Sequence, residues 1–275
     1  MNRFLKNRWA VLSLAFLLLL TLATLCAPLL TRYSFEEQQI SQRLSPPSFL
    51  HPMGTDLLGR DLYSRILYGA RVSLTVGVVT ALISLILGTL SGALAGYFGG
   101  WVDRCLSGIT HLFYIIPSLL LAILLTLVFG KGLTGLLVAL SATSWVTQAR
   151  LVRGQMLQAK QMPYVEAARS VGASTLSIIF RHILPNLWGP ILVALTIQIP
   201  TQVMSESFLS FIGLGLQPPY ASWGVLASEG FGAMRSFPHL ILYPGGILFI
   251  TLMAFNALGD GLRDWLDPAG DRNLM

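Results

Sequence analysis

The sequence contains few charged residues. Asp, Glu, Lys and Arg make up 11% of the chain, whereas soluble domains average about 25%. Hydrophobic residues make up 54% of the 275 positions, and the mean hydropathy is +0.68. This composition excludes an ordinary soluble domain. It predicts an all-α polytopic membrane protein, because helices satisfy their own backbone hydrogen bonds inside a bilayer.

The sequence also lacks the groupings that metal and catalytic sites require. Its two cysteines, Cys26 and Cys105, have no ligand-like spacing, and its four histidines are scattered over different segments. A Ser-His-Asp order and paired intramembrane carboxylates are missing, so a membrane enzyme is a weak alternative. We therefore expect no metal site and no catalytic residue. The net charge of +6 is spread among loops, which does not predict a nucleic-acid partner.

Long hydrophobic runs are the most prominent feature that is present. Each of six runs is long enough to cross about 30 Å of hydrocarbon as a helix. The first is too long for the core of a cleaved signal peptide and has no clear cleavage site, so we expect a retained helix. The runs are 9–30, 72–98, 107–129, 133–149, 190–212 and 239–261.

The distribution of Lys and Arg predicts the orientation of these spans. With the N-terminus inside, eleven of these residues fall on the cytoplasmic side and seven outside. This bias favours cytoplasmic N- and C-termini. Residues 1–71 then hold the first helix and an external loop with a surface helix. Residues 72–261 form a core of five helices with a cytoplasmic loop at 150–189, and 262–275 form a cytoplasmic tail.

Small residues recur at every fourth position of the second span. On a helix they form one stripe, along which another backbone can approach closely. We interpret this stripe as a helix-packing surface, and a flexible gating hinge is the alternative that the sequence leaves open. The series is Thr80, Ser84, Gly88, Gly92, Gly96 and Gly100.

The fifth span carries the most polar side chains. Gln198, Gln202 and Glu206 recur at four-residue intervals and so share one helix face. Polar groups in hydrocarbon must face protein or water. They could line a translocation path or join helices, and the sequence supports both interpretations equally. Glu206 lies near the predicted outer end of its helix, where it could simply reach water.

A polar stretch, MPYVEAARSVGASTLSIIFRHILPNLWGP (162–190), interrupts the apolar runs. Pro163 suits the first turn of a helix, Gly172 can adopt the left-handed conformation that ends it, and Ser174 can cap a second helix. We expect Pro185 and then Pro190 to stop this second helix before the fifth span. Its predicted apolar face consists of Leu176, Ile179, Phe180 and Ile183.

Two short helices joined at a glycine are thus predicted at the cytoplasmic face. The pair is too polar to span the membrane and too apolar on one side to lie free in water. It therefore suits a docking surface, although a loop resting on lipid headgroups is the alternative.

Within this stretch, EAARSVGASTLSIIFRHILPN resembles the EAA motif of membrane subunits of ATP-binding cassette importers. His182 occupies the isoleucine position of the general motif, and the RHILPN form is similar to the peptide and nickel branch. GTDLLGRDLYSRILYGARVSL, SFLSFIGLGLQPPYASWG and AFNALGDGLRDWLDP also resemble the C-type permease subunit of dipeptide and oligopeptide importers. The motif residues that the chain keeps are Glu166, Ala167, Ala168, Gly172, Leu184 and Pro185.

The resemblance implies a type I importer permease fold in a bacterial inner membrane. The EAA loop would be a coupling helix seated on a cytoplasmic ATPase. In it, Glu166 would make an electrostatic contact, Ala167 and Ala168 would pack closely, and Gly172 would set the corner. The implied partners are two ATPase subunits, a homologous B-type permease subunit and an extracytoplasmic solute-binding protein.

ATP and Mg would bind to the partner ATPases, and we expect no cofactor in this chain. A phosphate-binding loop is missing from it, because Leu125 stands where G-x-x-x-x-G-K needs its first glycine before Gly130-Lys131. Peptides lead as cargo, while nickel, glutathione and other small solutes stay open. A self-sufficient secondary transporter is the alternative of a different class, but no convincing internal repeat supports it.

Overall fold

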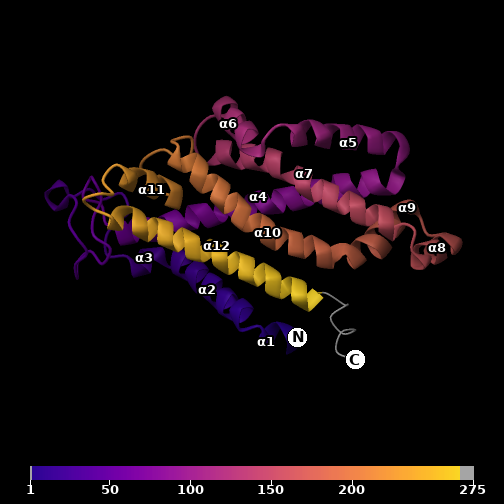
Figure 1. The fold of residues 1–275 in the computed structure, drawn as a ribbon, viewed down its shortest axis with the longest axis horizontal. Coiled ribbons are helices and arrows are strands. Elements are labelled where there is room, and N and C mark those ends of the chain that lie inside the picture. Colours follow the sequence, from indigo (N-terminus) through magenta and orange to yellow (C-terminus); the bar gives the residue numbers. More distant parts are fainter. Residues whose placement is uncertain (1, 267–275) are drawn as a thin grey trace.

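Every regular element in residues 2–266, the part of the chain that the computed structural model describes, is a helix (Figure 1). The elements are α1 (Asn2–Lys6), α2 (Arg8–Leu25), α3 (Ala27–Leu30), η1 (Ile40–Gln42), α4 (Leu62–Phe98), α5 (Gly100–Ile115), α6 (Ser118–Phe129), α7 (Leu133–Ala159), α8 (Pro163–Ser170), α9 (Thr175–Ser177), η2 (Ile178–Ile183), α10 (Leu184–Phe211), α11 (Trp223–Phe231) and α12 (His239–Leu266).

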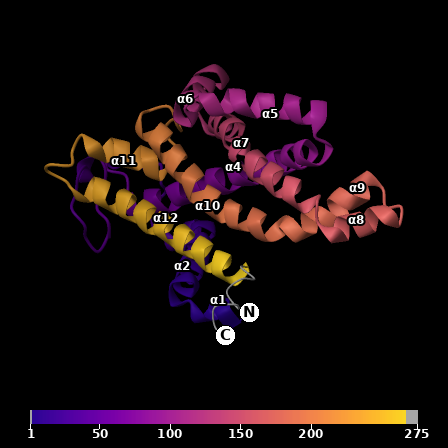
Figure 2. The same ribbon diagram turned by 45° about the vertical axis from the view of Figure 1, so that its right-hand side comes forward.

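The long helices form one elongated bundle. The helix α4 packs along α7, and α10 contacts both α4 and α12. On the other side of α12 lies α2, and α1 also contacts α12, so the two ends of the described chain lie close together (Figure 2). The two short helices α8 and α9 project at one end of the bundle, and α11 lies at the opposite end.

Within residues 2–266, four helical segments are long and apolar enough to cross a membrane. These are α2, α4, α12 and the continuous run Thr175–Phe211, and the pair α5–α6 makes a fifth if it is counted as one span. Helix α7 has the necessary length, but its Ser, Thr and Gln side chains make it less apolar. The fold is therefore that of a multi-pass, all-helical membrane protein.

The predicted third span, 107–129, is not one straight helix. Helices α5 and α6 meet at an angle of 92°. Ile116, between them, is extended, with φ −81° and ψ 126°. The cause is Pro117, which lacks an N–H group and excludes the preceding residue from the helical conformation. The break lies within the range where the sequence pattern predicted a continuous span.

The surface helix predicted in the external loop is instead the first part of α4. This helix runs for 37 residues from Leu62, and the side chain of Asp61 caps it by accepting from the backbone N–H of Ser64 at 2.8 Å. Asp61 also accepts from Nδ1 of His51, 2.9 Å away. The loop thus ends in the N-cap of a membrane helix, and the predicted boundary at residue 71 falls inside α4.

The stripe of small residues on α4 faces α7. A Cβ atom at Gly88 would lie 2.5 Å from Cβ of Gln148, and one at Gly92 would lie 2.4 Å from the carbonyl oxygen of Ala149. One at Gly96 would lie 2.7 Å from Cβ of Met156. These distances leave no room for a side chain. Gly100 takes no part in this contact: it begins α5, is exposed, and has no neighbouring atom within 4 Å of a Cβ position.

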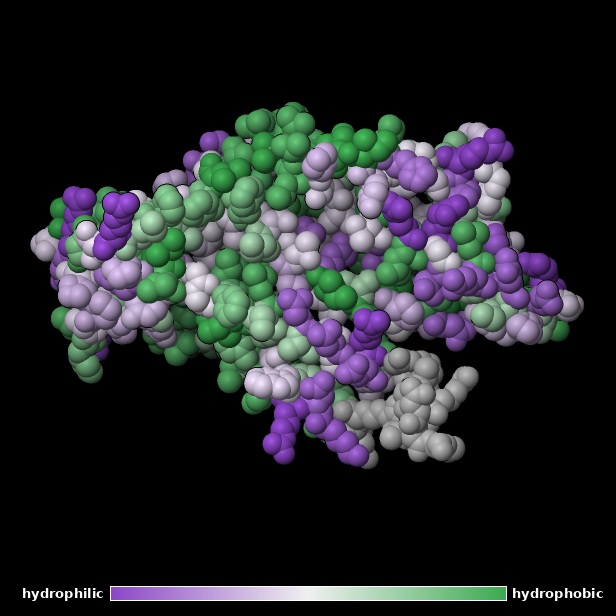
Figure 3. Space-filling model, in the orientation of Figure 1, coloured by the Kyte–Doolittle hydropathy of each residue, from purple (hydrophilic) through white to green (hydrophobic). Residues whose placement is uncertain are grey.

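Hydrophobic side chains cover α6 and the adjoining part of α5 on the face seen in Figure 3. Hydrophilic side chains gather toward the end formed by α8 and α9. This division matches a bundle that is embedded in lipid along its length and meets water at its ends.

Candidate functional site

The first half of the coupling segment, which we define as residues 162–185, ends at a glycine corner. Pro163 is the first residue of α8, and Gly172 has φ +81°. The N–H of Gly172 donates to the carbonyl of Arg169 at 3.0 Å, and that of Ala173 donates to the carbonyl of Ala168 at 3.1 Å. These two bonds form a Schellman motif, which satisfies carbonyl groups at a helix end. The sequence-based prediction of a left-handed glycine is confirmed.

The second half of the segment is continuous with α10. The side chain of Ser174 caps α9 by accepting from the N–H of Ser177, as predicted. The chain then passes through the π-helix η2 into α10 without a break, so one helical run extends from Thr175 to Phe211. Pro190 and Pro200 lie inside α10. The expectation that Pro185 and then Pro190 stop the helix is therefore wrong.

One buried apolar cluster fixes the coupling segment to the bundle. Val165 and Ala168 of α8 pack there with Ile179 and Ile183 of η2, alongside residues of α4, α7 and α10. Each large aliphatic side chain buried in this way contributes about 1.5–3 kcal/mol. The two halves of the segment are thus held as a unit on the helices that they join.

The predicted apolar face of the second helix is only half correct. Ile179 and Ile183 are 1% and 0% exposed, but Leu176 and Phe180 are 61% and 50% exposed. The reason is the π-helix, whose wider turn changes which side chains share a face. Ile178 takes a place in the cluster instead.

The motif residues divide between the surface and the interior. Glu166 and Ala167 are exposed, as are Gly172 and Pro185. Ala168 and Leu184 are buried against the cluster described above. The exposed surface of the segment also includes the apolar side chains Met162, Tyr164, Val171, Leu176 and Phe180. An acidic side chain surrounded by exposed apolar groups, outside the apolar core of the bundle, is suited to bind another protein.

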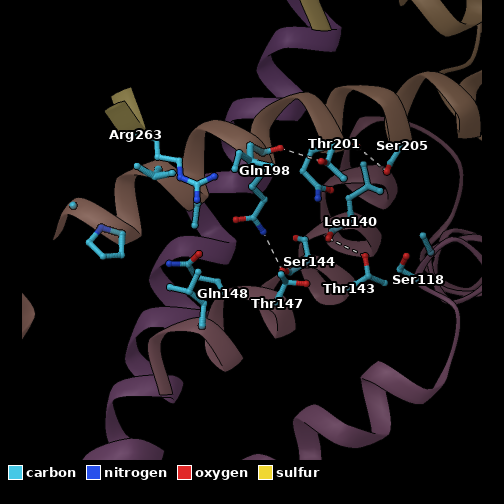
Figure 4. Close-up of a pocket in the computed structure, with 18 of the residues that line it drawn as sticks. Ser118, Leu140, Thr143, Ser144, Thr147, Gln148, Gln198, Thr201, Ser205 and Arg263 are labelled. Carbon is cyan, nitrogen blue, oxygen red and sulfur yellow. Dashed lines mark hydrogen bonds between the residues drawn. The ribbon is translucent and has the colours of Figure 1, made fainter. Parts of the chain in front are cut away.

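A cavity of about 860 Å³ lies between α6, α7, α10 and α12 (Figure 4). Most of the polar side chains that line it are uncharged amides and hydroxyls, and Arg263 is the one charged residue among the lining side chains of the described chain. The polar lining residues are Ser118, Thr143, Ser144, Thr147, Gln148, Asn186, Gln198, Thr201, Gln202, Ser205 and Arg263.

Gln198 and Gln202 both line this cavity. The amide Nε2 of Gln198 donates to the backbone carbonyl of Ser144 at 3.0 Å, which joins α10 to α7 across the cavity wall (Figure 4). One side chain thus has both features that the sequence left as alternatives: it borders the cavity and it connects two helices.

Glu206, the third polar residue of the fifth span, does not line the cavity. Its side chain is 0% exposed. Its carboxylate accepts from Ser73 Oγ of α4 at 2.8 Å and from Ser210 Oγ at 2.7 Å. It does not reach water, which the sequence left open, because the start of α11 lies beside it: the backbone N–H of Trp223 donates to Ser73 Oγ at 3.3 Å.

Sequence reasoning missed the contribution of α7 to the cavity. Four of its residues, Thr143, Ser144, Thr147 and Gln148, line the wall opposite α10. The signal in the sequence was their polarity within the predicted run 133–149, the shortest of the six runs. The helix in fact continues ten residues beyond the predicted end at 149.

A metal site is not evident in residues 2–266, where no group of three His, Cys, Asp or Glu side chains could hold an ion.

The fold defines a class of protein: a polytopic helical bundle with a polar cavity. One of its helices continues from the cavity wall into an exposed surface. Residues 84–271 match the family described as "Binding-protein-dependent transport system inner membrane component", and the chain belongs to this family. Residues 1–47 match the "N-terminal TM domain of oligopeptide transport permease C".

Curated relatives match nearly the whole chain. The oligopeptide transport system permease protein OppC of Bacillus subtilis (strain 168) is 42% identical over 268 residues, covering 98% of this chain and 88% of the relative. The dipeptide transport system permease protein DppC of the same strain is 45% identical, covering 97% and 84%. The glutathione transport system permease protein GsiD of Pectobacterium atrosepticum is 42% identical, covering 97% and 89%.

Solved structures share the fold. A chain of the MetNI methionine ABC transporter in an inward-facing conformation has a TM-score of 0.60 at 21% identity, covering 72% of this chain and 94% of that chain. A chain of an amino acid ABC transporter with histidines has a TM-score of 0.58 at 19% identity, covering 74% and 94%.

Proposed function

We propose that this chain is the C-type permease subunit of an ATP-binding cassette importer for dipeptides or oligopeptides. In this proposal it crosses a bacterial inner membrane six times, with both termini in the cytoplasm. It forms half of the translocation pathway. ATP and Mg bind to partner ATPases, and the chain itself binds no cofactor.

The observation that carries the proposal is the unbroken helical run Thr175–Phe211. Its first part belongs to the exposed coupling segment, and its later part supplies Gln198 and Gln202 to the cavity wall. Since a helix is stiff over this length, a force applied to the segment moves the wall. Closure of the ATPase pair would therefore shift the bundle between its two openings.

The coupling segment supplies the contact with the ATPase. Glu166 and Ala167 are exposed on α8, and the glycine corner sets the angle at which α8 leaves the bundle. Because the apolar cluster holds α8 against η2, the ATPase would grip a rigid element. Ala168, which is buried within the chain, supports α8 from beneath instead of touching the partner.

Two further partners complete the machine. Four helices of this chain border the cavity without enclosing it, so a homologous B-type subunit is needed for the other half. A solute-binding protein would deliver cargo at the opposite end of the bundle, where the loop 31–61 and α11 lie.

Peptides are the cargo that the cavity supports best. Its lining amides and hydroxyls both donate and accept hydrogen bonds, as peptide groups do. No carboxylate, imidazole or thiol is among the lining residues of the described chain, and these are the groups that hold nickel. Nickel transport is therefore the weaker alternative. Glutathione, a peptide-like molecule, is a further candidate, because the relatives include a glutathione transport system permease protein.

The test is reconstitution into liposomes with and without the ATPase, B-type and binding-protein partners. We expect uptake of a labelled dipeptide or oligopeptide only when all partners and ATP are present. Uptake by this chain alone without ATP would identify a secondary transporter and contradict the proposal. Uptake of nickel but not of peptides by the complete complex would contradict the cargo.

A further inference from the structure

A second, smaller cavity lies away from the proposed pathway. Its volume is about 210 Å³, and it is enclosed by α4, α5 and α7. Two arginines and a histidine line it together with hydroxyl groups, which is an unusual collection for the side of a membrane bundle. The polar lining residues are Ser91, Ser107, Thr110, His111, Arg150 and Arg153.

The positive charge in this cavity is only partly neutralised. Arg153 donates from Nε and Nη2 to the two carboxylate oxygens of Asp103, at 2.6 and 2.7 Å. Arg150 instead stacks over the ring of Tyr114, with 4.0 Å from Cζ to the ring centroid. Within the described part of the chain no carboxylate pairs with Arg150. Its guanidinium therefore has unused donors and an uncompensated charge.

The hydroxyl groups do not supply those missing partners. Ser107 Oγ donates to Asp103, Thr110 Oγ1 donates to the carbonyl of Ser107, and Ser91 Oγ donates within α4. Among the polar lining side chains of the described chain, Arg150 and His111 are those without a hydrogen-bond partner, and both can donate to a ligand. A ligand that fits them carries a negative charge and several acceptor oxygens, as a phosphate does.

The level of the cavity along the bundle matches that of lipid headgroups. Arg150 lies 17 residues beyond Leu133 on α7, which corresponds to about 26 Å at 1.5 Å per residue. The hydrocarbon core is about 30 Å thick. If α7 enters the core near Leu133, Arg150 lies close to its opposite surface.

The outer face of α5 is suited to acyl chains. Trp101, at its start, is 74% exposed, and Leu112 and Ile115 are 67% and 76% exposed. Leu112 and Ile115 lie near the other end of α5, 11 and 14 residues after Trp101. A tryptophan at a helix end is typical of the headgroup boundary, and exposed aliphatic side chains further along the helix suit the acyl chains. Arg150 and His111 are themselves exposed, so the cationic cavity opens at the surface of the bundle on the helix that carries these apolar side chains.

We propose that this cavity binds the headgroup phosphate of an anionic phospholipid, with Arg150 and His111 as donors and the acyl chains along α5. The proposal rests on the membrane placement given under the proposed function. Basic cavities between helices at the cytoplasmic surface are suited to anionic headgroups. The bound lipid would join α4, α5 and α7 beside the coupling segment, to which α7 leads directly.

The experiment compares lipid retention by the purified complex of this chain with its partners. The complex is reconstituted in nanodiscs of phosphatidylcholine with or without phosphatidylglycerol, extracted, and examined by native mass spectrometry. We expect the wild type to retain phosphatidylglycerol in preference to phosphatidylcholine. We expect the double variant Arg150→Gln, His111→Gln to retain about tenfold less, which corresponds to the loss of one charge-assisted hydrogen bond.

Arg104→Gln is the matched control. Arg104 is an exposed arginine on the same helix, α5, and does not line the cavity. It should keep the wild-type preference. If Arg104→Gln and the double variant retain equal amounts of phosphatidylglycerol, the loss reflects general surface charge. That result would contradict the proposed lipid site.

Two measurements on the wild type do not depend on whether the variants fold. Equal retention of the two lipids would overturn the proposal. If inorganic phosphate displaces phosphatidylglycerol, the cavity binds a free anion, and the proposal that a lipid occupies it is contradicted. Peptide uptake is measured on the same samples: normal uptake without lipid preference contradicts this site alone, whereas lipid preference without uptake contradicts the proposed function alone.

Discussion

Arg65 Nη1 donates to Asp56 Oδ2 at 2.6 Å, and the side chain of Arg65 is almost completely buried. Arg60 donates to the same carboxylate oxygen at 2.6 Å. Both arginines also contact Glu229 of α11. The external loop, the start of α4 and α11 are therefore joined by one buried network of charges. Asp56 of Gly-Thr-Asp and Arg60 of Gly-Arg-Asp both take part in this network.

Replacing Arg65 by leucine should destabilise the protein strongly. The change leaves two carboxylates facing one arginine in a buried site, and breaking a buried pair in this way typically costs about 3–5 kcal/mol. We expect a markedly lower melting temperature of the protein in detergent. Arg71→Leu is the control, because Arg71 is exposed on the same helix. Similar melting temperatures for the two variants would contradict a stabilising role of the network.

Reversing the charge at Glu166 should prevent association with the ATPase without affecting the fold. Glu166 is exposed on α8 and makes no ion pair within the described residues. We expect Glu166→Lys to insert normally and to melt like the wild type, but to lose the ATPase in co-purification. Glu37→Lys, a change at an exposed glutamate of the external loop, should retain it. Retention by Glu166→Lys would remove this residue from the interface.

Substituting Gly172 should show whether the backbone conformation at this corner matters, because an added Cβ atom meets no neighbouring atom. Its φ of +81° is unfavourable for a β-branched residue, and no atom lies within 4 Å of a Cβ position. We expect Gly172→Val to cost about 1–3 kcal/mol locally and to uncouple ATP hydrolysis from uptake. Asparagine tolerates the left-handed conformation, so Gly172→Asn should keep most of the coupling. Equal coupling in both variants would show that the corner angle does not matter.

The close contact between α4 and α7 should not tolerate a methyl group. A Cβ atom at Gly92 would lie 2.4 Å from the backbone oxygen of Ala149, which cannot move without moving α7. We expect Gly92→Ala to destabilise the protein by about 1–3 kcal/mol through overpacking. Gly154→Ala, in the open on α7, should be neutral or slightly stabilising. Thermal melting of the two variants makes the comparison.

Gln198→Leu should reduce uptake while leaving the complex assembled. The change removes the bond from Nε2 to the carbonyl of Ser144 and a polar group from the cavity wall. We expect a turnover up to about tenfold lower, with unchanged affinity for the loaded binding protein. Thr196→Val is the control, since Thr196 lies on α10 outside the cavity. A change in affinity alone would place Gln198 outside the pathway.

The sequence predicted features that depend on single residues and their neighbours. The helix start at Pro163, the left-handed Gly172 and the cap at Ser174 follow from local backbone chemistry, and the structure confirms them. Long apolar runs likewise indicated a helical membrane protein, because apolar runs of that length match the thickness of the hydrocarbon core.

Features that depend on tertiary packing were not predicted. Pro190 was expected to end a helix, but a proline inside a long helix is tolerated when the surrounding helices hold it in place. The sequence left open whether Glu206 reaches water, and contacts with α4 and the start of α11 bury it. The polar face of α7 and the π-helix also arise from contacts between segments, which a single-sequence pattern does not contain.

The helical run Thr175–Phe211 contains both residues of the coupling segment and residues that border the cavity. The coupling segment ends at Pro185, and the residues of the run that border the cavity begin at Asn186, so the two stretches adjoin on one helix. Surface substitutions at one stretch leave the other chemically intact. In the proposed transporter, residues of each stretch can therefore be changed separately, while the helix that they share links the movements of the segment and of the cavity wall.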